Sequence, residues 1–127
     1  MNQQQKQILM IAALLIGLAV CLGAFGAHGL ETMVAAKYLK TFNTGVKYQF
    51  YHGFALLFLA LIPSHLPQLN ISTVAVSFFI GILLFSFNCY LYALTQIKIF
   101  AMLVPIGGVL FIFGWFILAH KIYKELK

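Results

Sequence analysis

Long apolar stretches alternate with short polar segments along the chain. Four stretches stand out, covering about residues 8–30, 48–62, 73–95 and 99–120. A helix needs about 20 mostly apolar residues to cross a bilayer, and its backbone groups must be satisfied within the helix because lipid offers them no partners. The pattern therefore predicts an all-α integral membrane protein. We expect a four-transmembrane-helix bundle that makes a single domain of residues 1–127.

The segment between the first two stretches, residues 31–47, has a helical periodicity of its own. It separates two faces, with Lys37, Lys40, Thr44 and Lys47 on one and Val34, Tyr38, Leu39, Phe42 and Val46 on the other. A helix of this kind lies in the membrane interface, with its lysines toward water or phosphates. We expect a short interfacial amphipathic helix here, ended or bent by Asn43-Thr44-Gly45. An irregular loop is the alternative interpretation.

The other connections are short. Residues 63–72 contain two prolines, and we expect a tight turn in which Asn70 or Ser72 caps the third helix. Residues 96–98 leave room only for a tight hairpin between the third and fourth spans. The first stretch also has features of a secretory signal, namely Lys6 before the apolar run and small residues after it. It is long for such a signal, so we expect it to remain as the first span.

Composition supports lipid as the solvent of this chain. Of its 127 residues, 63% are hydrophobic and 8% are charged, whereas a soluble domain has about 25% charged residues. This excludes an ordinary cytosolic globule, a disordered tail and a collagen-like chain. The net charge of +6 comes from lysines near the ends of the apolar stretches, where membrane proteins place them. The chain has no arginine for bidentate contacts to nucleic acid, so we expect the lipid bilayer, and no nucleic acid, as its partner.

Four spans put both termini on one side of the membrane. That side carries Lys6, Lys121, Lys124 and Lys127, and the other side carries Lys37, Lys40, Lys47 and Lys98. The excess of positive charge that marks cytoplasmic loops is therefore nearly balanced. Because the C-terminal lysines form a compact cluster, while lysines on an interfacial helix can serve as surface anchors, we expect both termini in the cytoplasm.

Polar side chains inside the apolar stretches gather toward the leaflet next to the first connection, whereas the opposite half is nearly pure Leu, Ile, Phe and Val. Depth within each span, at a helix rise of about 1.5 Å per residue, places in that leaflet His28, Tyr48, Gln49, His52, Asn88, Tyr92 and Pro105. Polar groups inside a bilayer need partners and usually face the bundle interior. Pro105 also frees a backbone carbonyl and can kink its helix. Two interpretations stay open: interhelical hydrogen bonds worth roughly 1 kcal/mol each, or a polar pocket for a ligand.

The residue types needed for enzyme and cofactor chemistry are missing or poorly placed. His28 and His52, which we expect at similar depth on adjacent helices, could bind a metal or haem iron or relay protons, but the sequence offers no clear third ligand and no CxxCH motif. Cys21 and Cys89 lie in apolar runs, which is typical of buried small hydrophobic residues. The serines have no acidic residue nearby to orient a base, and there are no paired carboxylates. We expect no metal, no cofactor and no enzymatic activity.

Small residues recur at a spacing of four in the first span. Ala19, Gly23 and Ala27 form one stripe, and Ala13, Gly17 and Cys21 form a second beside it. Such stripes let helix backbones touch, so that van der Waals contact drives association. The helix-packing candidates of the whole chain are Gly17, Gly23, Ala27, Gly107, Gly108 and Gly114. Whether these seams join helices of one chain or of two chains stays open.

Short motifs occur in order along nearly the whole chain. They read GAFGAHGL at residues 23–30, TGVKYQFYH at 44–52, LFS at 84–86, LYAL at 91–94, PIGGV at 105–109 and GW at 114–115. In sequence and spacing they resemble the domain-of-unknown-function 423 family of small multi-pass bacterial inner-membrane proteins, whose eukaryotic relatives are called transmembrane protein 256. The resemblance implies four spans in the inner membrane with both ends in the cytoplasm. It carries no biochemical activity over to this chain.

The resemblance also singles out residues. The family motifs match this chain at His28, Tyr48, Gln49, His52, Ser86, Pro105, Gly107 and Gly108. The third motif departs from the family pattern, since Phe87-Asn88 replaces Gly-Ser, which weakens Asn88 as a site residue. Depth and motifs together give the candidate pocket, formed by His28, Tyr48, Gln49, His52, Ser86, Asn88, Tyr92 and Pro105.

Two functions remain in view. We expect a non-enzymatic membrane component that acts through helix contacts, in a homo-oligomer or with another membrane protein. The small-residue seams and the lack of catalytic constellations favour this function. The alternative is a protein that binds or transports a small molecule, lipid or ion in the polar pocket.

Overall fold

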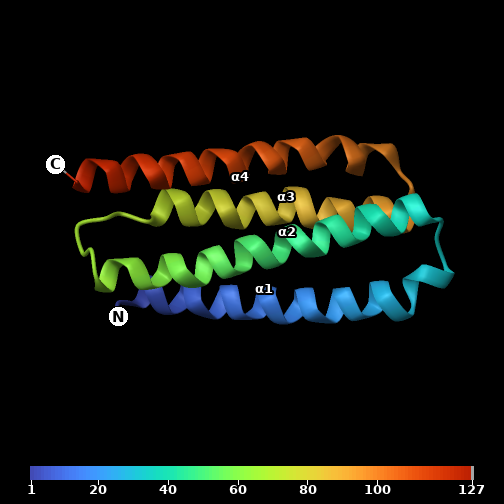
Figure 1. Ribbon diagram of the computed structural model, residues 1–127, viewed down its shortest axis with the longest axis horizontal. Helices are drawn as coiled ribbons and strands as arrows, with labels where there is room; N and C mark the ends of the chain where they lie inside the picture. The colour runs from blue at the N-terminus through green and yellow to red at the C-terminus, as the bar shows by residue number, and fades with distance from the viewer. Residues whose placement is uncertain (127) are drawn as a thin grey trace.

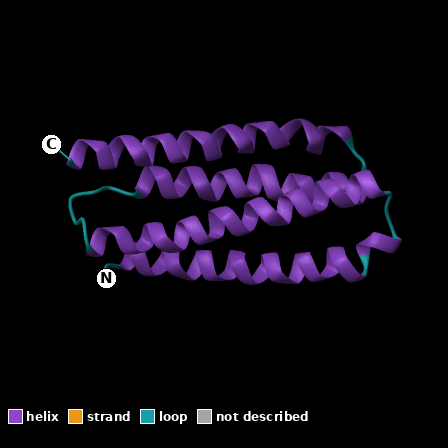
Figure 2. Cartoon of the chain, in the orientation of Figure 1, coloured by secondary structure: helices purple, strands orange, loops and turns teal. Residues whose placement is uncertain are grey.

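The computed structural model describes residues 1–126, and nearly all of them are helical. The elements follow in the order α1 (Gln3–His28), a 3-10 turn (Leu30–Thr32), α2 (Ala36–Leu61), a second 3-10 turn (Ile62–Ser64), α3 (Ser72–Thr95) and α4 (Lys98–Glu125) (Figure 1). Helices and loops make up the whole of Figure 2, and residues 1–126 contain no strand. Lys127 of the predicted C-terminal lysine cluster lies outside the described residues.

The length of the helices confirms the prediction of an all-α protein with four candidate spans. The shortest, α3, has 24 residues, which is about 36 Å at a rise of 1.5 Å per residue. All four helices are long and apolar enough to cross a membrane, whose hydrocarbon core is about 30 Å thick. Both termini lie at one end of the molecule, as expected for an even number of antiparallel spans (Figure 1).

The predicted turns at both ends of α3 are present, but the predicted cap is wrong: the N-cap residue of α3 is Ile71, without a side-chain cap hydrogen bond, and not Asn70 or Ser72. The side-chain oxygen of Asn70 accepts a hydrogen bond of 2.9 Å from the backbone N–H of Ser72, the first residue of α3. At the other end of α3, Gln96 has a φ of 56° and closes the helix in the left-handed region. Ile97 alone then separates Gln96 from the start of α4, so the predicted tight hairpin is confirmed.

The predicted interfacial helix over residues 31–47 is wrong. Residues 36–47 are the first three turns of α2, which runs unbroken to Leu61, so the second span is also longer than the predicted 48–62. The reason is packing: a Cβ atom on Gly45 would lie 2.8 Å from the Cβ atom of Cys89 in α3, so Gly45 is a helix contact and not a break. Phe42 and Val46 are buried. Residues 36–47 are helical and amphipathic, as the pattern indicates, but their apolar face packs against protein instead of lipid.

The four helices form an open layer. Figure 1 shows α1, α2, α3 and α4 side by side in chain order, and the extensive contacts are α1 with α2, α2 with α3 and α3 with α4. Of the residues in the most apolar stretch of each helix, 50% in α2 and 56% in α3 are buried. The corresponding share is 17% in α1 and 17% in α4. The outer helices therefore leave large apolar faces uncovered, in contrast to a closed four-helix bundle.

The core consists of two apolar clusters at different heights. One lies toward the termini and includes Leu15, Leu56, Phe78, Ile82 and Phe111. The other lies toward the first connection and is formed by Leu30, Phe42, Val46, Tyr90 and Ala93. Buried polar side chains lie between and beside these clusters, and their partners define the candidate site.

Candidate functional site

His52 lies near the middle of α2 and is 4% exposed. Its Nδ1 atom is 2.9 Å from the backbone carbonyl oxygen of Tyr48, and its Nε2 atom is 3.0 Å from the indole nitrogen of Trp115 in α4. A carbonyl oxygen only accepts and an indole N–H only donates, so this network assigns the proton to Nδ1 and makes the ring neutral. The ring also stacks on Phe111 at 3.5 Å between centroids. Both ring nitrogens are thus engaged in holding α2 against α4.

Gln49 connects three helices. It is fully buried, and its amide nitrogen donates to the carbonyl oxygen of Leu15 in α1 at 2.7 Å. Its amide oxygen accepts from the hydroxyl of Tyr90 in α3 at 2.6 Å. Hydrogen bonds of this kind fix the rotation and register of neighbouring helices in a membrane. For Gln49 and His52, the contacts agree with the packing interpretation.

The two polar candidates on α3 differ in their partners. The amide nitrogen of Asn88 donates to the carbonyl oxygen of Leu84 on its own helix at 2.8 Å, so this side chain serves α3 locally. Ser86 is fully buried, and its hydroxyl has no hydrogen-bond partner among residues 1–126. It lies where α2 and α3 approach most closely, because a Cβ atom on Gly45 would be 2.9 Å from the carbonyl oxygen of Ser86.

Three predicted pocket residues lie apart from this centre. His28 is exposed at the end of α1, and Pro105 is exposed on the outer side of α4. Tyr92 is half-buried and makes an edge contact with Tyr38, with ring centroids 5.7 Å apart.

Tyr48 is 37% exposed and packs on Phe85 at 4.8 Å between centroids.

The prediction that His28 and His52 share one depth is wrong. A Cβ atom on Gly53, the neighbour of His52, would lie 2.9 Å from Ile16 of α1, so His52 is level with the middle of α1. The twelve residues from Ile16 to His28 span about 18 Å of helix. The error follows from starting the second span at residue 48, because α2 begins twelve residues earlier.

Polar contacts also occur at the end of the molecule that carries the termini, which the sequence pattern marked as nearly apolar. Gln5 is 4% exposed and donates to the carbonyl oxygen of Ala60 at 2.8 Å. The hydroxyl of Ser77 in α3 donates to the carbonyl oxygen of Leu110 in α4 at 2.6 Å. A polar residue inside an otherwise apolar span was the available signal for Ser77. The expected restriction of polar groups to one leaflet is therefore wrong.

The small-residue candidates divide into packed and open positions. A Cβ atom on Gly107 would overlap the backbone nitrogen of Phe85, and one on Gly114 would lie 2.7 Å from the ring of Phe78, so both glycines join α4 to α3. Gly23 and Gly108 have ordinary contact distances of 3.5 and 3.7 Å. Around Gly17, apart from the adjacent residues and nearby backbone of α1 itself, no atom of residues 1–126 lies within 4 Å of such a Cβ position, and Ala27 is exposed.

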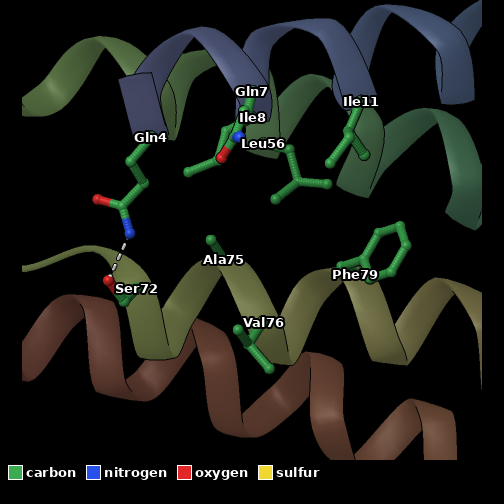
Figure 3. A pocket seen from close by; sticks show the side chains of 9 residues that line it. All are labelled: Gln4, Gln7, Ile8, Ile11, Leu56, Ser72, Ala75, Val76 and Phe79. Carbon is green, nitrogen blue, oxygen red and sulfur yellow. Dashed lines mark hydrogen bonds between the residues drawn. The ribbon is translucent and has the colours of Figure 1, made fainter. Parts of the chain in front are cut away.

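A hollow of about 200 Å³ lies between α1 and α3, with Leu56 of α2 at its base (Figure 3). Its lining is Gln4, Gln7, Ile8, Ile11, Leu56, Ser72, Ala75, Val76 and Phe79. At one end of the hollow, the amide nitrogen of Gln4 donates to the hydroxyl of Ser72 at 2.7 Å (Figure 3). The hollow contains none of the predicted pocket residues, and it lies at the end of the helices that carries the termini.

The described part of the chain brings no three His, Cys, Asp or Glu side chains together in the manner of a metal site. The chemistry of the buried layer is therefore that of neutral hydrogen bonds and aromatic contacts.

Residues 22–108 match a family model described as "Protein of unknown function (DUF423)". A UPF0382 membrane protein of Staphylococcus saprophyticus is 44% identical over 119 residues, which cover 94% of this chain and 98% of that protein. UPF0382 membrane protein YwdK of Bacillus subtilis is 39% identical over 122 residues, which cover 95% of this chain and 99% of that protein. No solved structure is significantly similar to the chain.

Proposed function

Since this chain belongs to the DUF423 family, we propose that it is a non-enzymatic component of the bacterial inner membrane that acts by associating with other membrane helices. The first partner that we propose is a second copy of the same chain, in a homo-oligomer. A different membrane protein on the same surface is the second. Both follow from the faces that the helix layer leaves open.

The outer face of α1 is the observation that carries this proposal. Ala13, Gly17 and Cys21 recur at a spacing of four, and all three are exposed. The space beside Gly17 is open within residues 1–126, whereas the space beside Gly107 and Gly114 is filled by α3. In lipid, helices associate through close van der Waals contact at small residues. An open stripe of this kind suits another helix.

The position of α1 in the layer supports the same proposal. α1 lies at one edge and packs chiefly on α2, and only 17% of its most apolar part is buried. An edge helix is accessible to a partner over its whole length. A second chain could pack there without rearranging α2, α3 or α4.

The native cysteines allow a direct test. Cys21 is exposed on the proposed face and Cys89 is buried. Oxidation of membranes with copper phenanthroline is expected to join two chains through Cys21, giving a dimer on a non-reducing gel. Cys21→Ser should abolish this product and Cys89→Ser should keep it. Gly17→Leu should also abolish it, because the added side chain holds the backbones apart.

Val109→Leu is the control for Gly17→Leu, because Val109 is exposed on α4 and the change adds bulk away from the proposed face. A product of different mass from the dimer would identify a different membrane protein as partner. Cross-linking that Gly17→Leu leaves unchanged would contradict the proposal, as would the absence of any product through Cys21.

The hollow between α1 and α3 supports a second candidate function, the binding of a lipid acyl chain. Most of its lining residues are apolar, and Gln4, Gln7 and Ser72 add polar groups to the lining. Ala75→Phe would fill the hollow and is expected to reduce the lipid that co-purifies with the protein, as measured by mass spectrometry. Val109→Phe is the control on a lipid-facing position. Equal lipid content in both variants would contradict this function.

We also propose that both termini lie in the cytoplasm. The two ends of the molecule carry nearly equal numbers of lysines, but Lys121 and Lys124 form a compact cluster at the end that carries the termini (Figure 1), as lysines that flank spans on the cytoplasmic side do. Green fluorescent protein fused to the C-terminus should therefore fluoresce, and alkaline phosphatase fused there should be inactive. The opposite pair of results would reverse the orientation.

A further inference from the structure

The continuity of α2 gives its lysines a new setting. Lys40 and Lys47 are seven residues apart and lie on one face of a single helix that enters the membrane. With Ala36, Leu39, Asn43 and Thr44, they line a hollow on the outer side of α2. Both lysines are exposed. The hollow is thus a cationic groove of two helical turns, at the end of the molecule that carries the first connection.

Lys47 lies deep for a charged residue. At about 1.5 Å per residue, it is about 16 Å along the axis from the start of α2 at Ala36. Its neighbours in sequence, Val46 and Gly45, contact Gly23 of α1 and Cys89 of α3, which lie five and six residues inside the ends of those helices. A lysine at such a depth directs its ammonium toward the interface, and a charge within a span needs a partner.

Residues 1–126 do not supply that partner. Its acidic side chains are Glu31 and Glu125. Glu125 is at the far end of α4 and accepts a hydrogen bond from Gln68, and Glu31 is exposed in the turn before α2. Within residues 1–126, no carboxylate forms an ion pair with Lys40 or Lys47. A second copy of the chain has the same two glutamates near the ends of its spans, so it lacks an acidic group at this depth as well.

The face changes character along the helix. Beyond Lys47, the same side of α2 carries Tyr51, Phe54 and Phe58, which are 54%, 45% and 68% exposed. The face therefore presents two ammonium groups and a polar amide first, and then a strip of aromatic rings. This order matches the order of a phospholipid, from the phosphate at the interface to the acyl chains below.

We propose that this face of α2 binds one anionic phospholipid. Its phosphodiester lies between the ammonium groups of Lys40 and Lys47, beside Asn43, and its acyl chains run along Tyr51, Phe54 and Phe58. The lipid neutralises charge that the protein leaves unpaired. The site is separate from the small-residue face of α1 and does not depend on the proposed self-association.

The test compares two lipids that differ in headgroup charge. Phosphatidylglycerol and phosphatidylcholine with identical acyl chains are titrated onto the purified protein in detergent, and bound lipid is counted by native mass spectrometry. Wild-type protein is expected to prefer phosphatidylglycerol. The double variant Lys40→Gln, Lys47→Gln should bind it about 25-fold more weakly, since each lysine near the surface contributes about fivefold. Binding of phosphatidylcholine should stay unchanged.

The control removes the same charge elsewhere. Lys121→Gln, Lys124→Gln changes two lysines near the far end of α4 and should keep the preference of the wild type. Circular dichroism checks that both double variants are folded. If a glutamine variant does not fold, Lys47→Arg takes its place, and this variant should retain binding because it keeps the charge. Equal losses in the two double variants would overturn the proposal. So would equal binding of both lipids to the wild type, or displacement of phosphatidylglycerol by millimolar inorganic phosphate, which would identify a free-phosphate site.

Discussion

Trp115 and His52 meet across the interface between α2 and α4, where most other contacts are apolar. The indole N–H donates to His52, and His52 in turn donates to the carbonyl oxygen of Tyr48. In lipid, a polar group without a partner costs several kcal/mol. The loss of Trp115 would therefore leave Nε2 of His52, which is 4% exposed, without its donor in a buried position.

We expect Trp115→Phe to destabilise the protein. The phenyl ring keeps much of the contact with Phe78 but leaves Nε2 of His52 without its donor. The free energy of unfolding, measured by steric trapping in bicelles, should fall by about 1 kcal/mol, as for other interhelical hydrogen bonds in membranes. Phe116→Leu changes the next residue, which is 72% exposed, and should have no effect. Equal stability of Trp115→Phe and the wild type would show that this hydrogen bond is dispensable.

Sequence reasoning located some of these residues but not their partners. Depth and motifs identified Gln49 and His52 as polar residues within a span. Their partners, the carbonyl oxygen of Leu15 and the indole of Trp115, depend on the rotation and depth of each helix. Those are fixed by packing over the full interface. No local pattern around Trp115 or Leu15 shows which side chain of another helix they meet.

At the scale of helices, glycines determine how closely α3 and α4 approach. Gly81 and Gly107 face each other's helix, so that a Cβ atom on Gly107 would lie 2.8 Å from the carbonyl oxygen of Gly81. Gly114 repeats the close approach two turns later, against Phe78. This contact explains why the hairpin packs tightly although α4 is little buried elsewhere.

Two matched substitutions separate this packing from the open face of α1. Gly107→Ala should force α3 and α4 apart and lower the free energy of unfolding by about 1–3 kcal/mol, the usual cost of overpacking. Gly17→Ala should leave stability unchanged or raise it by up to about 1 kcal/mol, because alanine is the better helix former and the site is open. The same unfolding measurement compares both. A larger loss for Gly17→Ala than for Gly107→Ala would contradict the assignment of the seams.

The boundary of α2 was the main error at this scale, and it had consequences. The sequence pattern placed the helix break at Asn43-Thr44-Gly45, because these residues are typical of turns. In the structure, Gly45 lies against Cys89 and Ser86, and tertiary packing overrides the local preference. The remaining three helices are apolar almost throughout, so their positions were predictable from hydropathy alone.

At the scale of the whole molecule, the open layer is the feature on which the proposed association with other helices depends. Two central helices carry the polar contacts, and two outer helices present apolar faces to their surroundings. The number of spans and the common side of the termini followed from the sequence. The open arrangement of the helices could not be predicted, because periodicity shows which positions are apolar but not whether protein or lipid covers them.

The layer has different surfaces on its edge helix α1 and on α2, one of its two central helices. The outer face of α1 carries a stripe of small, uncharged residues, and the exposed face of α2 carries Lys40 and Lys47. The first suits another helix and the second suits an anionic lipid. The proposed self-association therefore concerns α1 alone, which makes it measurable as a distance between two copies of one residue.

Pulsed electron paramagnetic resonance on spin-labelled Cys21, in a Cys89→Ser background reconstituted at high lipid-to-protein ratio, measures that distance directly. Helices in contact have axes about 8–10 Å apart, so we expect a distance distribution below about 30 Å between the labels of two chains, and its loss in Gly17→Leu. The absence of any dipolar signal from Cys21, or the same distribution in Gly17→Leu, would contradict the account.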